Sequence, residues 1–269
     1  FNETSFAREY ESIWSGSAED AFFNSDMFDK HREIKQPEYE YSGRSTKDSY
    51  YLLSVDVGRI GCSSVVCVFK VIPQPEGNSI KKLVNMYTFD EEHMGIQALR
   101  IKSLFYKYKA KAVVIDGNGL GVGLIDFMVI KSIDEATGDE YPAFDVINDT
   151  EGLYKKFKTV DSEKEAIYII KANAPLNTEI HSNCSAQINA GKVKFLEDER
   201  FAKSKLLGTK VGENMTPEQR AEYLRPFTLT SILKEEMMNL REEHDGVNII
   251  LKQANRKIKK DKFSAFEYG

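Results

Sequence analysis

The chain has 269 residues, of which 41% are hydrophobic and 29% charged, and its net charge at pH 7 is −5. This composition is typical of a globular protein. No apolar run approaches the roughly 20 residues of a membrane-spanning helix, and no signal-peptide pattern opens the sequence. The three cysteines and four histidines are scattered, which argues against a disulfide framework and against a zinc or histidine-based metal site.

Residues 1–45 differ in character from the rest of the sequence. Residues 6–11 predict a short helix, and Phe22, Phe23 and Phe28 are apolar anchors in a polar stretch. Residues 36–47 have the composition of a linker. We therefore predict a connecting segment at residues 1–45, cut from the end of a preceding domain, and one folded domain at residues 46–269.

The first part of that domain predicts a sheet. Residues 50–57 form a continuous apolar run, as in a strand buried on both faces. Residues 64–72 and 81–89 are rich in β-branched and aromatic side chains, and predict two further strands of an antiparallel meander. Asp90 begins a predicted helix, and residues 111–116 follow as a strand parallel to the first. The apolar stripe expected on this helix consists of Ile96, Leu99, Leu104, Phe105 and Tyr108.

The second half mixes helices and strands. In chain order the pattern predicts a helix at 124–130, a strand at 142–147, helices at 162–172 and 176–189, a short strand at 191–196, helical sequence at 218–240 interrupted at Pro226, a strand at 247–253 and a helix from 258 onward. The predicted fold class is α/β. Its mixed central sheet combines a three-strand antiparallel meander with parallel strands and is flanked by helices.

Three aspartates stand out in this arrangement. Asp56 and Asp116 each end a predicted strand, and Asp261 lies beside a late apolar helical face. Neighbouring strands would bring the first two carboxylates together, where like charges repel. A divalent cation between them removes this cost, and carboxylates with open water positions suit Mg²⁺ or Mn²⁺. The pattern therefore favours a metal-dependent phosphoryl-transfer site, and above all a nuclease.

Basic residues accompany the third aspartate. A phosphate backbone must be attracted to a site that is itself negative, so we assign DNA binding to basic side chains near the acids. These are Lys192, Lys194, Arg256, Lys257, Lys259, Lys260 and Lys262. Because contacts to the backbone carry no base information, little sequence preference is expected.

The order of elements, with Asp56, Asp116 and Asp261 in these places, resembles the ribonuclease H-like nuclease fold. More narrowly, the sequence resembles the C-terminal nuclease domain of the large terminase subunit of tailed bacteriophages, whose relatives occur in herpesviruses. Residues 6–10 followed by residues 21–23 are similar to the stretch that ends the packaging ATPase and leads into the nuclease. The resemblance covers most of the chain, on short motifs.

This resemblance implies an endonuclease that cuts concatemeric viral double-stranded DNA during genome packaging in the host cytoplasm, away from any membrane. Its implied partners are an N-terminal ATPase domain, the small terminase subunit and the portal. Asp56 and Asp116 would bind Mg²⁺ or Mn²⁺ together and Asp261 would complete the site, with two ions in the active complex. The sequence departs from the family at residues 62–64 and at Lys262, where acids are often found. These departures predict one strong metal site and one that fills with substrate or at high metal concentration.

Other interpretations use the same residues. Taken singly, Asp56 can be a strand end, Asp116 part of an Asn-Gly turn, and Asp261 a helix-surface acid paired with lysines. Asp145, Asp149 and Asp161 are reserve candidates for the site, and Asp145, on a predicted strand, is the best of them. The glycine-containing loops after Asp56 and Asp116 also resemble the two phosphate loops of the actin and sugar-kinase fold, which normally needs two such domains. A third possibility is a DNA-binding or portal-docking module with a degenerate site.

Overall fold

The computed structural model of the chain describes residues 20–43, 48–58, 63–75, 77, 79–157 and 164–269. Within these residues the central sheet has seven strands in the order β7-β8-β4-β1-β2-β3-β9. Their bounds are β1 Tyr50–Asp56, β2 Ser63–Pro73, β3 Ser79–Asp90, β4 Ala112–Asp116, β7 Phe144–Val146, β8 Lys164–Ile170 and β9 Val193–Lys194.

The sheet has the mixed topology that the sequence predicts. Strands β1, β2 and β3 form an antiparallel meander, while β4 lies parallel to β1 on its other side. Strands β8 and β7 continue the parallel part, and β9 adds a short parallel strand beside β3. The expected α/β class, a mixed sheet in which an antiparallel meander is joined to parallel strands and flanked by helices, is thereby confirmed.

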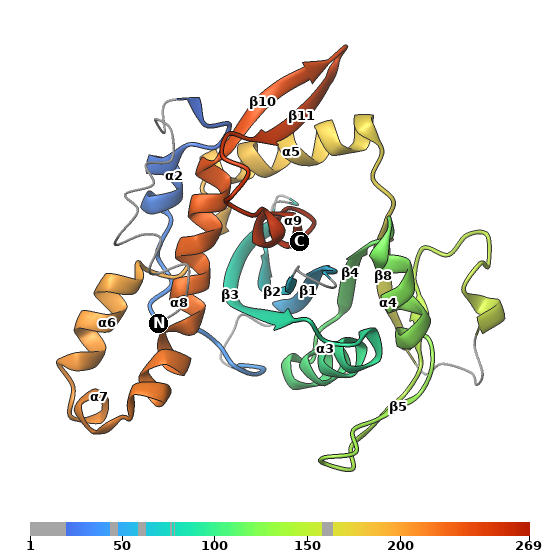
Figure 1. Cartoon of the computed structure of the whole chain (residues 1–269), viewed down its shortest axis with the longest axis horizontal. Helices are drawn as coiled ribbons and strands as arrows, with labels where there is room; N and C mark the ends of the chain where they lie inside the picture. The colour runs from blue at the N-terminus through green and yellow to red at the C-terminus, as the bar shows by residue number, and fades with distance from the viewer. Residues whose placement is uncertain (1–19, 44–47, 59–62, 76, 78, 158–163) are drawn as a thin grey trace.

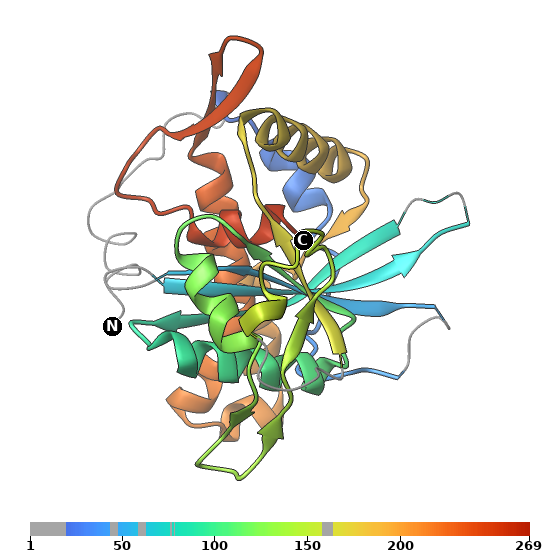
Figure 2. The same ribbon diagram turned by 90° about the vertical axis from the view of Figure 1, so that its right-hand side faces the viewer.

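Helices cover both faces of this sheet, as the views in Figures 1 and 2 show. Helices α3 (Met94–Tyr108) and α4 (Leu120–Met128) pack on one face, in a core that contains Leu53 and Val55 of β1. The opposite face is covered by elements from both ends of the chain: α2 (Ser25–Lys30), α5 (Ala174–Asn189), α8 (Pro217–Met238) and α9 (Asp261–Glu267). Strand β1 is thus buried from both sides, which explains its continuous apolar sequence.

The remaining elements extend from this body. Helices α6 (Glu199–Leu207) and α7 (Lys210–Asn214) precede α8. Strands β10 (Leu240–Asp245) and β11 (Asn248–Gln253) form a hairpin beside α5, and β5 (Ser132–Ile133) pairs with β6 (Glu140–Tyr141). Of the helices described, none has the length and apolar character needed to cross a membrane.

The segment before residue 45 packs on the same body as the sheet. Phe23 and Phe28 are core side chains, and the Phe28 ring stacks on Phe195 with 3.8 Å between ring centroids. The Ile34 amide donates to the Phe195 carbonyl at 2.9 Å. Residues 6–11 lie outside the described residues, and a preceding ATPase domain with a boundary near residue 45 stays a prediction.

The sequence prediction for residues 162–172 was wrong. The helix expected there is β8, an inner strand of the central sheet. Ile167 and Ile169 are buried while Tyr168 between them is 45% exposed, which is the alternation of a strand. Strand β8 fits between β4 and β7 and gives both a hydrogen-bonding partner. A short apolar run is compatible with a helix or a strand, and here the pairing with β4 makes it a strand.

Two helices also differ from their predicted form. Helix α3 begins at Met94 with His93 as its cap, and Ile96 is 49% exposed because the helical period through Ala98, Ile101 and Phe105 turns it away from the core. Helix α8 continues through Pro226 without interruption. Its packing overrides the proline, since Phe227 and Leu233 are fully buried.

Candidate active site

The first two predicted site residues end neighbouring parallel strands. Val55 of β1 is in register with Ile115 of β4, so Asp56 and Asp116 follow side by side at the same edge of the sheet. The Asn118 amide donates to Asp116 Oδ1 at 2.9 Å, which holds this carboxylate in a tight turn. The expectation that the two strands bring these aspartates together agrees with the register.

The glycines after Asp116 have a structural explanation. A Cβ at Gly121 would lie 1.6 Å from the Asp116 carbonyl oxygen, and one at Gly117 would lie 2.2 Å from the Ile169 side chain. Both positions therefore require glycine so that α4 and β8 can approach the end of β4. Packing of the chain on itself accounts for the pattern that resembles a phosphate loop.

Asp261 joins the two strand-end aspartates from a distant part of the sequence. It is the first residue of α9, which packs on β1 and β2. Burial raises the pKa of Asp56 to about 7, and the negative charges of Asp261 and Asp116 add to this effect, while Lys260 opposes it. The three predicted carboxylates thus lie close enough to interact, and the charged form of Asp56 is disfavoured by its surroundings.

Two further carboxylates near this cluster were not predicted from the sequence. Glu236 of α8 is 2% exposed, and burial raises its pKa to about 7 against the opposing effect of Lys262. Glu267 of α9 lies 2.7 Å from His181 Nδ1, and burial raises its pKa as well. A signal existed for Glu236, because its spacing from Leu229 and Leu233 places it in the apolar stripe of α8.

The chemistry of this donor set fits a hard divalent cation. Several carboxylates share one partly buried region, and their mutual repulsion is relieved when a cation binds. In the described residues, no three His, Cys, Asp or Glu side chains already lie at metal-holding distance. Ser64, in the stretch 62–64 where a further acid was considered, donates its hydroxyl to Gln97 Oε1 at 2.6 Å. Ser64 therefore acts in packing.

The basic residues proposed for DNA binding lie in three different surroundings. Arg256, Lys257, Lys259 and Lys260 are exposed in the loop between β11 and α9, next to Asp261. Lys262 is instead directed to Glu236, with 3.3 Å between Nζ and Oε1. Lys192 and Lys194 lie at β9, separated from β1 in the sheet by β2 and β3, and Lys194 Nζ is 2.6 Å from Glu33 Oε1. Lys260 and Lys262 thus lie near the acids, whereas Lys192 and Lys194 lie at the β9 edge of the sheet.

The reserve acids do not join the cluster. Asp145 pairs in register with Glu165 at the start of β8, whereas Asp116 pairs with Ile170 at its end. Asp149 accepts hydrogen bonds from the Leu153 and Tyr154 amides in a local turn. Asp161 lies outside the described residues.

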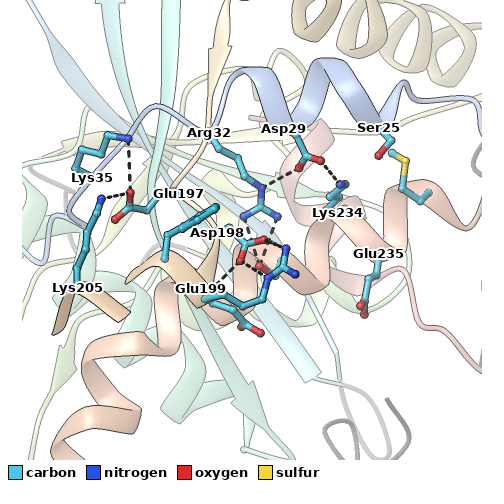
Figure 3. A pocket seen from close by; sticks show the side chains of 14 residues that line it. Ser25, Asp29, Arg32, Lys35, Glu197, Asp198, Glu199, Lys205, Lys234 and Glu235 are labelled. Atoms are coloured by element: carbon cyan, nitrogen blue, oxygen red, sulfur yellow. Dashed lines mark hydrogen bonds and ion pairs between the residues drawn. The ribbon is translucent and has the colours of Figure 1, made fainter. Parts of the chain in front are cut away.

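A separate cavity of about 940 Å³ lies between α2, α6 and α8 and contains none of the three aspartates (Figure 3). Its charged side chains neutralise one another: Asp29 pairs with Arg32 at 3.2 Å and with Lys234 at 2.5 Å, and Glu197 pairs with Lys205 at 2.6 Å. These internal pairs leave the carboxylate cluster at the sheet edge as the better candidate for chemistry.

Comparison with known proteins gives matches among solved structures only. No family model matches the sequence, and no curated protein matches it. The magnesium-bound large terminase nuclease from the thermophilic phage G20c is 15% identical over 93% of this chain and 95% of its own, with a TM-score of 0.49. The large terminase of bacteriophage HK97 is 7% identical over 92% of this chain and 42% of its own, with a TM-score of 0.47. Over more than 90% of its length, the chain is thus similar to a phage large terminase nuclease and to a phage large terminase.

Proposed function

We propose that this chain is a metal-dependent endonuclease that cuts double-stranded DNA during viral genome packaging, as the nuclease part of a large terminase. The observation that supports the proposal best is the meeting of Asp56 and Asp116 at the ends of parallel strands with Asp261 from α9. Carboxylates gathered at one sheet edge, beside an exposed basic loop, suit the hydrolysis of a phosphodiester.

In this proposal Asp56, Asp116 and Asp261 hold Mg²⁺ or Mn²⁺. A bound divalent ion supplies an activated water and stabilises charge on the leaving oxygen. Strand β1, which Asp56 ends, pairs with the strand of Asp116 and packs against α9, which carries Asp261, so Asp56 would share a bound ion with both of the others. Serine and lysine stand where further acids often occur in the family, so we expect one strong ion site and a second that fills with substrate.

The basic loop before α9 has the second role. Lys260 stabilises the charged form of Asp56, so its ammonium group lies within electrostatic range of the acids. Together with the exposed Arg256 and Lys257 it is placed to attract and position the DNA backbone. Such contacts do not depend on base sequence, so little sequence preference is proposed.

The biological setting is proposed from the family resemblance. A preceding ATPase domain would move the DNA, and the small terminase subunit and the portal would be the protein partners, all in the host cytoplasm.

The decisive experiment incubates the purified protein with supercoiled plasmid in Mn²⁺, Mg²⁺ or EDTA. The wild type is expected to nick and linearise the plasmid with either metal and to be inactive in EDTA. Asp116→Ala should be inactive in all conditions, whereas Asp145→Asn, which changes an acid away from the cluster, should behave as the wild type. Cleavage by Asp116→Ala, or none by the wild type in any metal, would refute the proposal and make ATP binding the next test.

A further inference from the structure

Helix α9, which carries Asp261, is short and has an unusual beginning. It contains seven residues, and Asp261 is the first of them. In the described structure the preceding residue, Lys260, makes no side-chain capping bond. The first amides of a helix need acceptors, and a helix this short gains little stability of its own. Something outside α9 must therefore fix its first turn.

Glu236 of α8 supplies the missing acceptor. Its Oε2 accepts a hydrogen bond from the Phe263 amide at 2.9 Å, and its Oε1 lies 3.3 Å from Lys262 Nζ. Both side chains are removed from solvent, with 2% of Glu236 and 13% of Lys262 exposed. One buried carboxylate thus bonds the two residues that follow Asp261, the first (Lys262) through its side chain and the second (Phe263) through its backbone amide.

Stability alone does not explain a carboxylate at this position. Buried ion pairs are often no more stabilising than apolar residues of similar size, because both charges lose their hydration. Leu229, Leu233 and Met237 show that this side of α8 otherwise carries apolar side chains. A bond to the Phe263 amide, by contrast, fixes the direction in which α9 begins, and an apolar side chain cannot make that bond.

The other end of α9 is fixed in a comparable way. Glu267, its last residue, lies 2.7 Å from His181 Nδ1 of α5. Phe263 packs between, with its ring 5.2 Å from that of Phe23. With its end and middle already held, the start of α9 is the part whose position depends on Glu236.

We propose that Glu236 is a positioning residue of the nuclease site: by fixing the first turn of α9 it holds Asp261 beside Asp56. This inference rests on the proposed function. Glu236 would raise metal affinity by positioning Asp261, and Glu236 itself need not touch DNA. Partners that orient metal ligands typically contribute 10- to 100-fold in metal affinity.

The test compares Glu236→Ala, Glu236→Gln and the control Glu235→Gln. Glu235 is the adjacent acid on α8 but lines the cavity between α2 and α6. Two quantities are measured over a Mn²⁺ titration: the metal concentration that gives half of the thermal shift, and the initial rate of plasmid nicking.

We expect Glu236→Ala to need at least about 10-fold more Mn²⁺ for half of the thermal shift, and to recover most of the wild-type nicking rate when Mn²⁺ is saturating. Glu236→Gln keeps an acceptor for the Phe263 amide but loses the charge that holds Lys262, so its midpoint should lie between those of the wild type and Glu236→Ala. Glu235→Gln should have the wild-type midpoint.

The outcomes separate this inference from the proposed function. A wild type that neither nicks plasmid nor binds Mn²⁺ refutes the function. An active wild type with an unchanged midpoint in the Glu236 variants refutes only the inference, even if those variants melt at lower temperature. If Glu236→Ala does not fold, Glu236→Gln decides alone: a raised midpoint supports the positioning role, and a wild-type midpoint overturns it.

Discussion

Replacing Asp56 by asparagine should abolish cleavage and, without metal, make the protein more stable. The reason is the position of Asp56 at the end of β1, partly buried and facing Asp261 and Asp116. These surroundings disfavour its charged form. Asparagine has nearly the same shape and removes the charge, so the cost of ionisation disappears while the packing is retained.

The size of this effect follows from the pKa. The pKa of Asp56 is raised from 3.8 to about 7, and at about 1.4 kcal/mol per pH unit this corresponds to about 4 kcal/mol. Because the folded-state pKa is raised, the contribution to stability is fully present below pH 3.8 and is lost as the pH rises through about 7. For a chain of this size the advantage of Asp56→Asn above pH 7 amounts to a melting temperature on the order of 10 °C higher.

Thermal unfolding in EDTA at pH 5 and pH 8 measures this difference, with Asp126→Asn, an exposed acid of α4, as the control. The stability gap between Asp56→Asn and the wild type should grow by roughly 2–3 kcal/mol between the two pH values. Adding Mn²⁺ should raise the melting temperature of the wild type much more than that of the variant. A variant that is less stable than the wild type at pH 8 would refute the account of the site.

Three further predictions concern other parts of the fold. Ile167→Ala, in the inner strand β8, should lower the free energy of unfolding by about 2–5 kcal/mol in urea denaturation. A loss below about 1 kcal/mol would contradict the packing of Ile167 in the core. Arg256→Ala with Lys257→Ala should weaken plasmid binding and reduce the dependence of log Kd on log salt by about 2; an unchanged slope would exclude phosphate contacts. His181→Ala should lower the free energy of unfolding by about 1–3 kcal/mol, because Glu267 loses its partner; an unchanged free energy of unfolding would refute the pairing.

Sequence patterns were sufficient to place residues whose neighbours in the sequence determine the element that carries them. The continuous apolar run before Asp56 and the helical crossover before Asp116 placed both residues on parallel neighbours, and the register confirms that arrangement. Asp261 was predicted because it lies beside an apolar helical face and basic residues surround it. In each case the information lies within a few residues of the aspartate, which is the range over which a sequence pattern can be interpreted.

The features that sequence patterns missed depend on contacts between distant segments. Strand β8 was predicted as a helix because its apolar run fits both structures until β4 offers an edge for pairing. The place of Glu236 in the apolar stripe of α8 marked it as unusual but did not give its partner, since the Phe263 amide that it bonds belongs to another helix. The DNA-binding role of Lys194 stays a prediction, and its ion pair with Glu33, from the segment that was predicted as a linker, could not be read from the sequence.

The docking of α9 has a consequence for how the site would come into being. Asp56 and Asp116 lie on the paired strands β1 and β4, with only β2, β3 and α3 between them in the chain, whereas Asp261 arrives only when a late segment docks on β1 and β2. Native-state hydrogen exchange commonly shows that segments with few buried contacts open before central strands. A molecule in which α9 has opened would keep its sheet and two of its acids but lose the third. Cleavage would then depend on the closing equilibrium of seven residues.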